Sequence, residues 1–183
     1  MRARRPRTKD KGDPFMAGAP LTQTQLPLNA IMDINGTQTY LGTTFALPAA
    51  GTSLTNTSEI PLTVIKNPSG SGKSLFIYIR AFSSNLNPVV FRTYLNPTTN
   101  VLGATTTPIN MRTGATQTSI SLCYEGATIT SNGTLMDVYA GGTNSFLPTA
   151  LLVLDQGKNL LITGQQNAAG TSLAIPQVVW YEI

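Results

Sequence analysis

Short apolar runs separated by turn-forming residues recur along the chain and predict strands rather than helices. In the clearest example, Pro61–Arg80, two runs flank the turn-rich segment Asn67–Ser74. The flanking runs, Leu62–Ile65 and Leu75–Ile79, are β-branched and aromatic, which is typical of β-strands. Proline and glycines between them indicate a tight connection. The pattern therefore predicts two strands joined as a hairpin.

The same pattern continues from about residue 31 to the last residue. Turn signals follow one another at a spacing of roughly 8–12 residues, which favours an all-β sandwich or barrel. A second hairpin signal covers Leu151–Ile162, and helical spacing is limited to a single short turn at Asn144–Ala150. The expected strands are Thr37–Leu47, Ile60–Lys66, Ser74–Phe82, Val89–Leu95, Pro108–Met111, Thr118–Tyr124, Leu135–Tyr139, Leu151–Leu154, Asn159–Thr163 and Gln177–Ile183.

Alternation within Ser74–Ala81 predicts a strand in the middle of a sheet. Leu75, Ile77 and Ile79 fall on one face, because side chains two residues apart in a strand point the same way. The residues of the other face, from Phe76 to Arg80, are also largely apolar, so we expect both faces to be buried, either within the body or against a partner.

Charge separates the chain into two parts. Only 11% of residues are charged, and Thr, Asn, Ser and Gln supply the polarity, which favours strands. The first thirteen residues carry six cations and two acids, whereas the six later cations balance six acids. We therefore predict an extended basic N-terminal arm and linker over 1–30 and a neutral β-sandwich domain over 31–183. A neutral body tolerates close packing against copies of itself.

The arm is the predicted partner-binding region. Its cations would pair with an acidic protein surface or with phosphates, and its apolar residues would add buried contacts. Nucleic acid is the less favoured partner, because no aromatic residues stand among the cations to stack on bases. The arm residues assigned to partner binding are Arg2, Arg4, Arg5, Arg7, Lys9, Lys11, Phe15, Leu21, Leu26 and Leu28.

Residue types argue against an enzyme. Without histidine the chain cannot form a Ser-His-Asp or Cys-His site, and a zinc site would have neither imidazole nor a second thiol. The single cysteine, Cys123, lies in a predicted strand and is expected to be a small buried residue. No apolar run reaches the length of a membrane-spanning helix. We expect no catalytic residues, no metal, no cofactor and no membrane contact.

One segment imitates a nucleotide-binding motif. Gly70–Ser74 reads Gly-Ser-Gly-Lys-Ser, but a phosphate loop needs an earlier glycine where this chain has Asn67. The loop also needs a helix after it, whose N-terminus faces the phosphate, and Leu75–Ile79 is a predicted strand. We interpret the segment as a turn whose glycines permit positive φ angles.

Four segments form a recurring combination of strands and turns: Glu59–Leu62, the turn Asn67–Lys73, the strand Leu75–Arg80 and the late segment Leu154–Leu161. Together they resemble the small jelly-roll virion proteins of tailed bacteriophages. The resemblance covers roughly residues 37–183. It implies a jelly-roll-like β-sandwich that serves as a capsid decoration or cement protein, a head fibre or a tail-associated module. Members of this group are often homotrimers attached to the particle through an N-terminal segment.

The sequence thus leads to a non-enzymatic virion protein, assembled in the host cytoplasm, that joins copies of itself and grips a major capsid or tail protein through its arm. Two alternatives stay open. One is a tail- or fibre-associated receptor- or glycan-binding sandwich, in which Tyr94, Trp180 and Tyr181 would form a stacking platform. The other is a small icosahedral coat protein whose arm faces nucleic acid.

Overall fold

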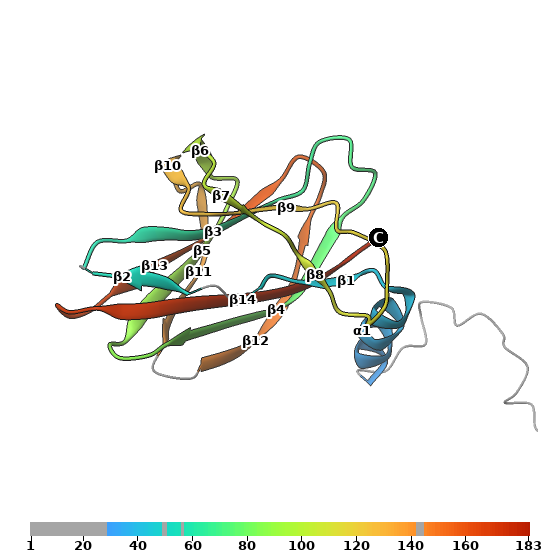
Figure 1. Ribbon diagram of the computed structural model, residues 1–183, viewed down its shortest axis with the longest axis horizontal. Coiled ribbons are helices and arrows are strands. Elements are labelled where there is room, and N and C mark those ends of the chain that lie inside the picture. The colour runs from blue at the N-terminus through green and yellow to red at the C-terminus, as the bar shows by residue number, and fades with distance from the viewer. Residues whose placement is uncertain (1–28, 49–50, 56, 142–144) are drawn as a thin grey trace, which may run out of the picture.

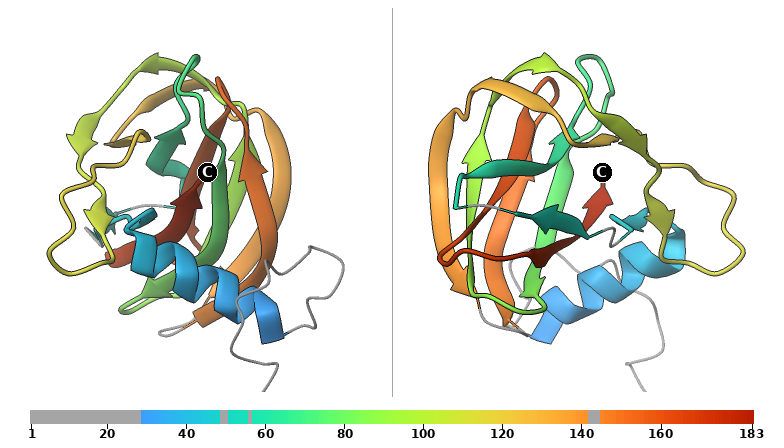
Figure 2. Two further views of the ribbon diagram at one scale, coloured as in Figure 1. Left: turned by 90° about the vertical axis from the view of Figure 1, so that its right-hand side faces the viewer. Right: turned by 60° about the vertical axis from the view of Figure 1, so that its left-hand side comes forward.

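The computed structural model describes residues 29–48, 51–55, 57–141 and 145–183. Two antiparallel β-sheets face each other in this part of the chain, and one helix lies across an end of the first sheet (Figures 1 and 2). The all-β sandwich architecture predicted from the sequence is therefore confirmed at this level.

The first sheet has the order β12-β4-β14-β1-β8, and β2 also pairs with β14. Its central strand β14 contacts β4 along nine residue pairs, from Ala174–Ser84 to Glu182–Leu75. The strands of this sheet are β1 (Thr44–Ala46), β2 (Thr52–Leu54), β4 (Leu75–Ser84), β8 (Ile109–Asn110), β12 (Ser145–Leu154) and β14 (Ser172–Glu182).

The second sheet has the order β11-β5-β13-β3-β9-β7. A separate two-stranded sheet, β6 (Thr98–Val101) with β10 (Thr128–Ser131), lies beside it. The strands of the second sheet are β3 (Ile60–Lys66), β5 (Val89–Leu95), β7 (Ala104–Thr106), β9 (Leu122–Glu125), β11 (Thr134–Gly141) and β13 (Asn159–Gln166).

The main core lies between the two sheets. Phe45 and Trp180 of the first sheet and Phe91 of the second are among its largest fully buried side chains. A smaller apolar cluster forms on the other face of the second sheet, where Val64 and Leu161 meet residues from the β9–β10 region. Both clusters follow from the alternation of apolar side chains along each strand, which places successive residues on opposite faces.

The two predicted hairpins are wrong. Strands β3 and β4 belong to different sheets, and so do β12 and β13. The loops at 67–74 and 155–158 therefore pass from one sheet to the other instead of joining neighbouring strands. The sequence pattern identified the strands and the turns, but it does not specify which strands pair. The apolar faces of the two sheets are buried against each other, and this packing places the two strands of each predicted hairpin in different sheets.

The predicted strand Thr37–Leu47 is also wrong over its first half. The helix α1 (Asn29–Leu41) occupies that region, including the expected Asn35-Gly36 turn. Gly42 ends the helix with a φ of 75°, and the Gly42 and Thr43 N–H groups donate to the Thr39 and Gln38 carbonyls. This is a glycine-terminated Schellman arrangement. The helix packs against β1 and β14 rather than being specified by its own apolar spacing.

The short helical turn expected at Asn144–Ala150 is replaced by strand from Ser145 onward. Four short Thr-rich strands, β2, β6, β7 and β10, were not predicted, because their polar residues give no apolar alternation. The central position of β4 between β12 and β14 is confirmed.

A bulge changes the direction of side chains within β4. Ile79 pairs with Val179 and Ile77 with Trp180, so Tyr78 is an extra residue in the ladder. The residues after a bulge change faces relative to strict alternation. Arg80 consequently lies opposite Val178, a buried residue of the main core, and is itself buried. Strict alternation placed Arg80 on the face opposite Leu75 and Ile77, and this prediction is wrong, because the bulge turns Arg80 toward the main core.

Candidate interaction surface

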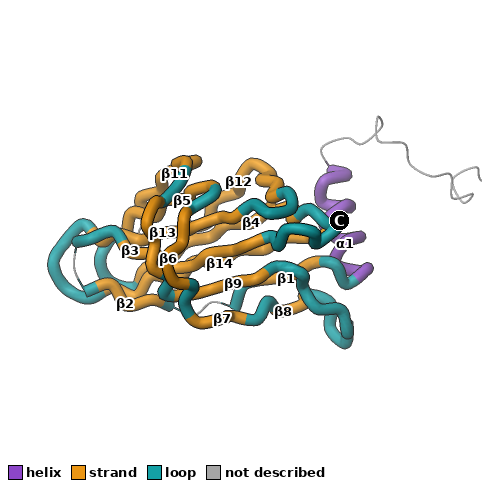
Figure 3. The backbone as a smooth tube through the Cα atoms, turned by 90° about the horizontal axis from the view of Figure 1, so that it is seen from above, coloured by secondary structure: helices purple, strands orange, loops and turns teal. Residues whose placement is uncertain are grey.

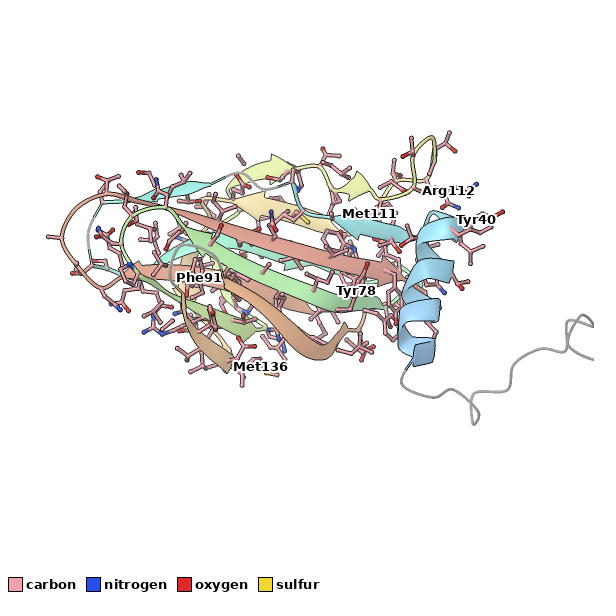
Figure 4. The ribbon with its side chains drawn as sticks, turned by 90° about the horizontal axis from the view of Figure 1, so that it is seen from below. Tyr40, Tyr78, Phe91, Met111, Arg112 and Met136 are labelled. Carbon is pink, nitrogen blue, oxygen red and sulfur yellow. The ribbon has the colours of Figure 1, made fainter. Side chains whose placement is uncertain are left out.

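A free edge of the second sheet carries three exposed apolar side chains on one strand. Strand β11 is the last strand of its sheet and pairs only with β5. Leu135, Met136 and Val138 on this strand are 49%, 47% and 54% exposed. Figure 4 shows Met136 at the margin of the body, away from Met111 and Arg112. We call these three residues the edge surface.

The free edge of the first sheet lies on the same side of the sandwich as the edge surface (Figure 3). Strand β12 is the last strand there, and its residues Leu151 and Val153 are exposed. Figure 3 shows β11 and β12 on the same side of the sandwich. β12 has an irregular register between Pro148 and Leu152 and, unlike β11, contains a proline, Pro148. Proline removes a backbone donor, so β12 is a poor template for another strand.

Strand β11 has one charged side chain, and that side chain has an internal partner. Asp137 follows a bulge between Leu135 and Asp137 and pairs with Thr93, whose side chain is buried. Arg80 Nη1, from the facing sheet, lies 2.7 Å from Asp137 Oδ2. The contact is an ion pair without an aligned hydrogen bond, and Arg80 Nε has no hydrogen-bond partner among the described residues. The pair ties the edge strand to β4.

A second exposed apolar group lies at the end of α1. Tyr40 and Leu41 of the helix and Ile109 and Met111 near β8 are all exposed. The Arg112 guanidinium lies 5.2 Å from the centre of the Tyr40 ring, a cation–π distance. Figure 4 shows Tyr40, Met111 and Arg112 close together beside the helix. This group combines apolar area with a positive charge.

The turn that imitates a phosphate loop serves as a structural connection. Asn67 is buried, and its Nδ2 donates to the Lys73 carbonyl at 2.8 Å and the Leu154 carbonyl at 2.9 Å. The Asn67 backbone N–H donates to the Lys158 carbonyl, and the Asn67 carbonyl accepts from the Gly157 N–H. Asn67 thus joins both inter-sheet loops. We call this region, loops 67–74 and 155–158, the closed end.

Gly70 and Gly72 in the same loop have φ angles of 77° and 73°, as the sequence interpretation required. The loop leads into strand β4, so no helix N-terminus faces it. Lys73, in the same loop, has its Nζ 3.8 Å from Glu182 Oε2. Because the Lys73 side chain is 40% exposed, this ion pair is weak, on the order of 0–1 kcal/mol.

Glu182 is a buried carboxylate held mainly by uncharged donors. The Ser119 hydroxyl donates to Oε1 through a short bond, and the Ile120 N–H contacts Oε1 and Oε2 at 3.1 and 3.2 Å. The Trp180 Nε1–H lies 3.3 Å from Oε1. These contacts attach the segment before β9 to strand β14, which is a structural role.

Cys123 is fully buried, as predicted. Burial raises the pKa of its thiol to about 12, and the nearby Glu182 carboxylate adds to that increase. A thiol that stays protonated is a poor nucleophile.

The aromatic residues of the proposed stacking platform are not available on the surface. Tyr94, Trp180 and Tyr181 are all buried. Trp180 belongs to the main core and Tyr94 to the smaller cluster, whereas Tyr181 stacks on Phe76 at 5.0 Å between ring centres. These three side chains therefore do not form an exposed stacking platform.

The predicted partner-binding residues lie outside the described residues. The set, which is not tested by the structure, is Arg2, Arg4, Arg5, Arg7, Lys9, Lys11, Phe15, Leu21, Leu26 and Leu28.

Within the described residues, no group of three or more Cys, Asp or Glu side chains is arranged to hold a metal ion. No described helix has the length and apolar character needed to cross a membrane. Comparison with known proteins finds no family model that matches the chain and no curated protein that matches it.

Proposed function

We propose that the protein is a non-enzymatic structural subunit of a bacteriophage particle, of the capsid decoration or cement kind. Its jelly-roll-like body would join copies of itself, and its basic arm would reach a major capsid or tail protein. The observation that carries this proposal is the edge surface, where a long edge strand presents apolar residues to solvent. Soluble monomers usually protect such edges.

The charge distribution supports assembly from identical subunits. Residues 29–183 contain six basic and six acidic residues, so their formal net charge is zero. Copies of such a body approach one another without long-range repulsion. The remaining charge, +4, falls in residues 1–13, where six cations face two acids. An arm of that kind attracts an acidic surface on a different subunit.

The environments of the reactive side chains support a role without catalysis. The one cysteine is buried with a raised pKa. In the turn 67–74, Lys73 contacts Glu182 and the Ser71 hydroxyl donates to Asn67. Each has a structural partner that accounts for its position.

Stabilisation of a particle would come chiefly from buried area. Exposed ion pairs made by the arm contribute about 0–1 kcal/mol each, so apolar contacts from Phe15, Leu21, Leu26 and Leu28 must supplement them. The effect would be multiplied by the number of copies on the particle.

The test is removal of residues 1–28 from the copy assembled into particles. We expect the truncated protein to be lost from purified particles, or the particles to break at a lower temperature. A matched variant that replaces the six arm cations with glutamine separates charge from apolar contact. Unchanged occupancy after truncation would contradict anchoring by the arm. Nucleic acid released together with the protein at high salt would favour the coat-protein alternative.

A further inference from the structure

We infer that strand β11 is the surface through which two copies of this chain join, by antiparallel pairing of one β11 with the other. This inference rests on the proposed function and deepens it, since it names the contact between copies. The second sheet of one copy and the second sheet of the other would then form one continuous sheet across the contact. This recurring mode of recognition is called β-augmentation.

Backbone geometry makes β11 the suitable edge. From Asp137 to Gly141 the strand pairs with β5 in regular register. On the side away from β5 no strand pairs with it in the described chain. The other edges are poorer templates, because β2, β7 and β8 have only two or three residues, β6 and β10 have four, and β12 contains Pro148. Short strands and proline are common protection against edge pairing.

The one charged side chain of β11, Asp137, would oppose pairing with another strand if it had no partner, but it is paired with Arg80. An inward-pointing charge protects an edge because an added strand would bury it. Asp137 is such a charge, but Arg80 Nη1 lies 2.7 Å from it. Pairing of the strand therefore does not bury an uncompensated carboxylate. Arg80 acts here as a positioning residue, and it reaches Asp137 only because the Tyr78 bulge turns it inward.

The remaining side chains of β11 suit a second copy of the same strand. Val138 and Ala140 lie opposite Arg92 and Val90 on the outer face of the sheet, and both are exposed. Between two β11 strands they would meet small apolar side chains without like charges. Such cross-strand pairs are favourable. A partner recognised by charge would find nothing to pair with on this strand.

The symmetry of the contact follows from the pairing. An antiparallel pair of identical strands has a two-fold axis, so this surface yields dimers. The trimer implied by the sequence resemblance would require a different, head-to-tail contact. The mass of the purified full chain in solution separates the two.

The test compares sedimentation of the full-length protein with that of Val138→Lys. We expect the wild-type chain to form a dimer and Val138→Lys to raise its dissociation constant at least tenfold, because each copy would place a charged side chain on the small apolar face of the contact. Val101→Lys is the matched control, since Val101 is 57% exposed on β6, away from the proposed contact. The control is expected to dimerise normally.

A charge-swap mixture tests two-fold pairing directly. Val138→Lys and Val138→Glu should each be monomeric alone, whereas an equimolar mixture should dimerise again, because the opposite charges then lie on the same face of the shared sheet. No recovery on mixing, or a wild-type trimer that Val138→Lys leaves intact, would overturn the inference. A trimer insensitive to Val138→Lys would leave self-assembly of the subunit in place, so the two proposals fail separately.

The role of Arg80 has its own test. Arg80→Met leaves Asp137 without a partner and should weaken dimerisation, whereas Arg80→Met with Asp137→Asn should restore it. Near-ultraviolet circular dichroism checks that each variant is folded. Equal dimerisation of the single and double variants would overturn the role of Arg80, and the Val138 variants still test the contact if either is unfolded.

Discussion

The closed end and the β11 edge differ in how far their hydrogen-bonding groups find partners within the chain. At the closed end Asn67 bonds to both inter-sheet loops, and the nearby Glu182 receives donors from three residues. At the edge, β11 has one pairing strand and its apolar side chains face solvent. The closed end thus satisfies its buried polar groups within the chain, whereas the edge strand is where we propose that a second copy pairs.

Replacement of Asn67 with alanine should have the largest effect on stability. The Leu154 carbonyl would lose a donor at a buried site, the Lys73 carbonyl would keep only the Ser71 hydroxyl, and the bonds that Asn67 makes to both loops would go; an unsatisfied buried group costs about 1–3 kcal/mol. We expect a loss of about 3 kcal/mol in the free energy of unfolding, measured with urea. Asn167→Ala, at an exposed position, is the control and should change stability by less than about 0.5 kcal/mol. A similar loss in both variants would contradict the role of Asn67.

Replacement of Glu182 with glutamine should have the next largest effect. The Ser119 hydroxyl and the Ile120 N–H donate to this carboxylate, and bonds to a charged group are worth about 1.5–3 kcal/mol. We expect the free energy of unfolding, measured by thermal denaturation, to fall by about 2 kcal/mol. Lys73→Met should cost less than about 1 kcal/mol, because that ion pair is exposed. A larger effect from Lys73→Met would mean that charge, not hydrogen bonding, holds this region.

Alkaline pH should destabilise the body. The pKa of Cys123 is raised by burial from 9.0 to about 12, and burial also raises the pKa of Tyr78, Tyr94 and Tyr181. An unfolded thiol loses its proton near pH 9 while the folded thiol keeps it. This stabilising contribution is therefore complete below pH 9 and is lost as pH rises toward 12.

At one pH unit above the ordinary thiol pKa, ionisation of Cys123 in the unfolded chain lowers the free energy of unfolding by about 1 kcal/mol. Urea midpoints at pH 8 and pH 10 measure the change. Cys123→Ala should reduce the pH dependence, and an identical pH dependence in that variant would exclude the thiol as its source.

Replacement of Val138 with lysine should have the smallest effect on stability. The side chain is exposed, so the free energy of unfolding measured on the monomer should change by less than about 0.5 kcal/mol. Association should nevertheless be lost. A destabilised monomer would mean that the edge contributes to folding, which would remove the contrast between the two regions.

Much of the strand content was predictable because alternation marks it locally. The bounds of β3 and β5 agree with the prediction, and Cys123 is buried as expected. Polar strands such as β6 and β10 give no such signal. Helix α1 was missed because its apolar residues have no helical period, although Gly42 after Leu41 is a terminating signal that could have indicated it.

The candidate surface was only half predictable. Leu135–Tyr139 was expected to be a strand, but nothing in its residues indicates that it stands last in a sheet. Strand order depends on contacts between residues far apart in the chain, such as Asp137 with Thr93 and Arg80.

The sequence by itself determined the β-rich class, the positions of the turns, the absence of histidine chemistry and the separation of a basic segment from a neutral body. These depend on local composition and on the two-residue period of a strand. Only the tertiary structure decided that Pro61–Arg80 spans two sheets, that the Tyr78 bulge turns Arg80 inward, and that β11 is a free edge. Each depends on which distant strand buries a given face, and local pattern does not specify that choice.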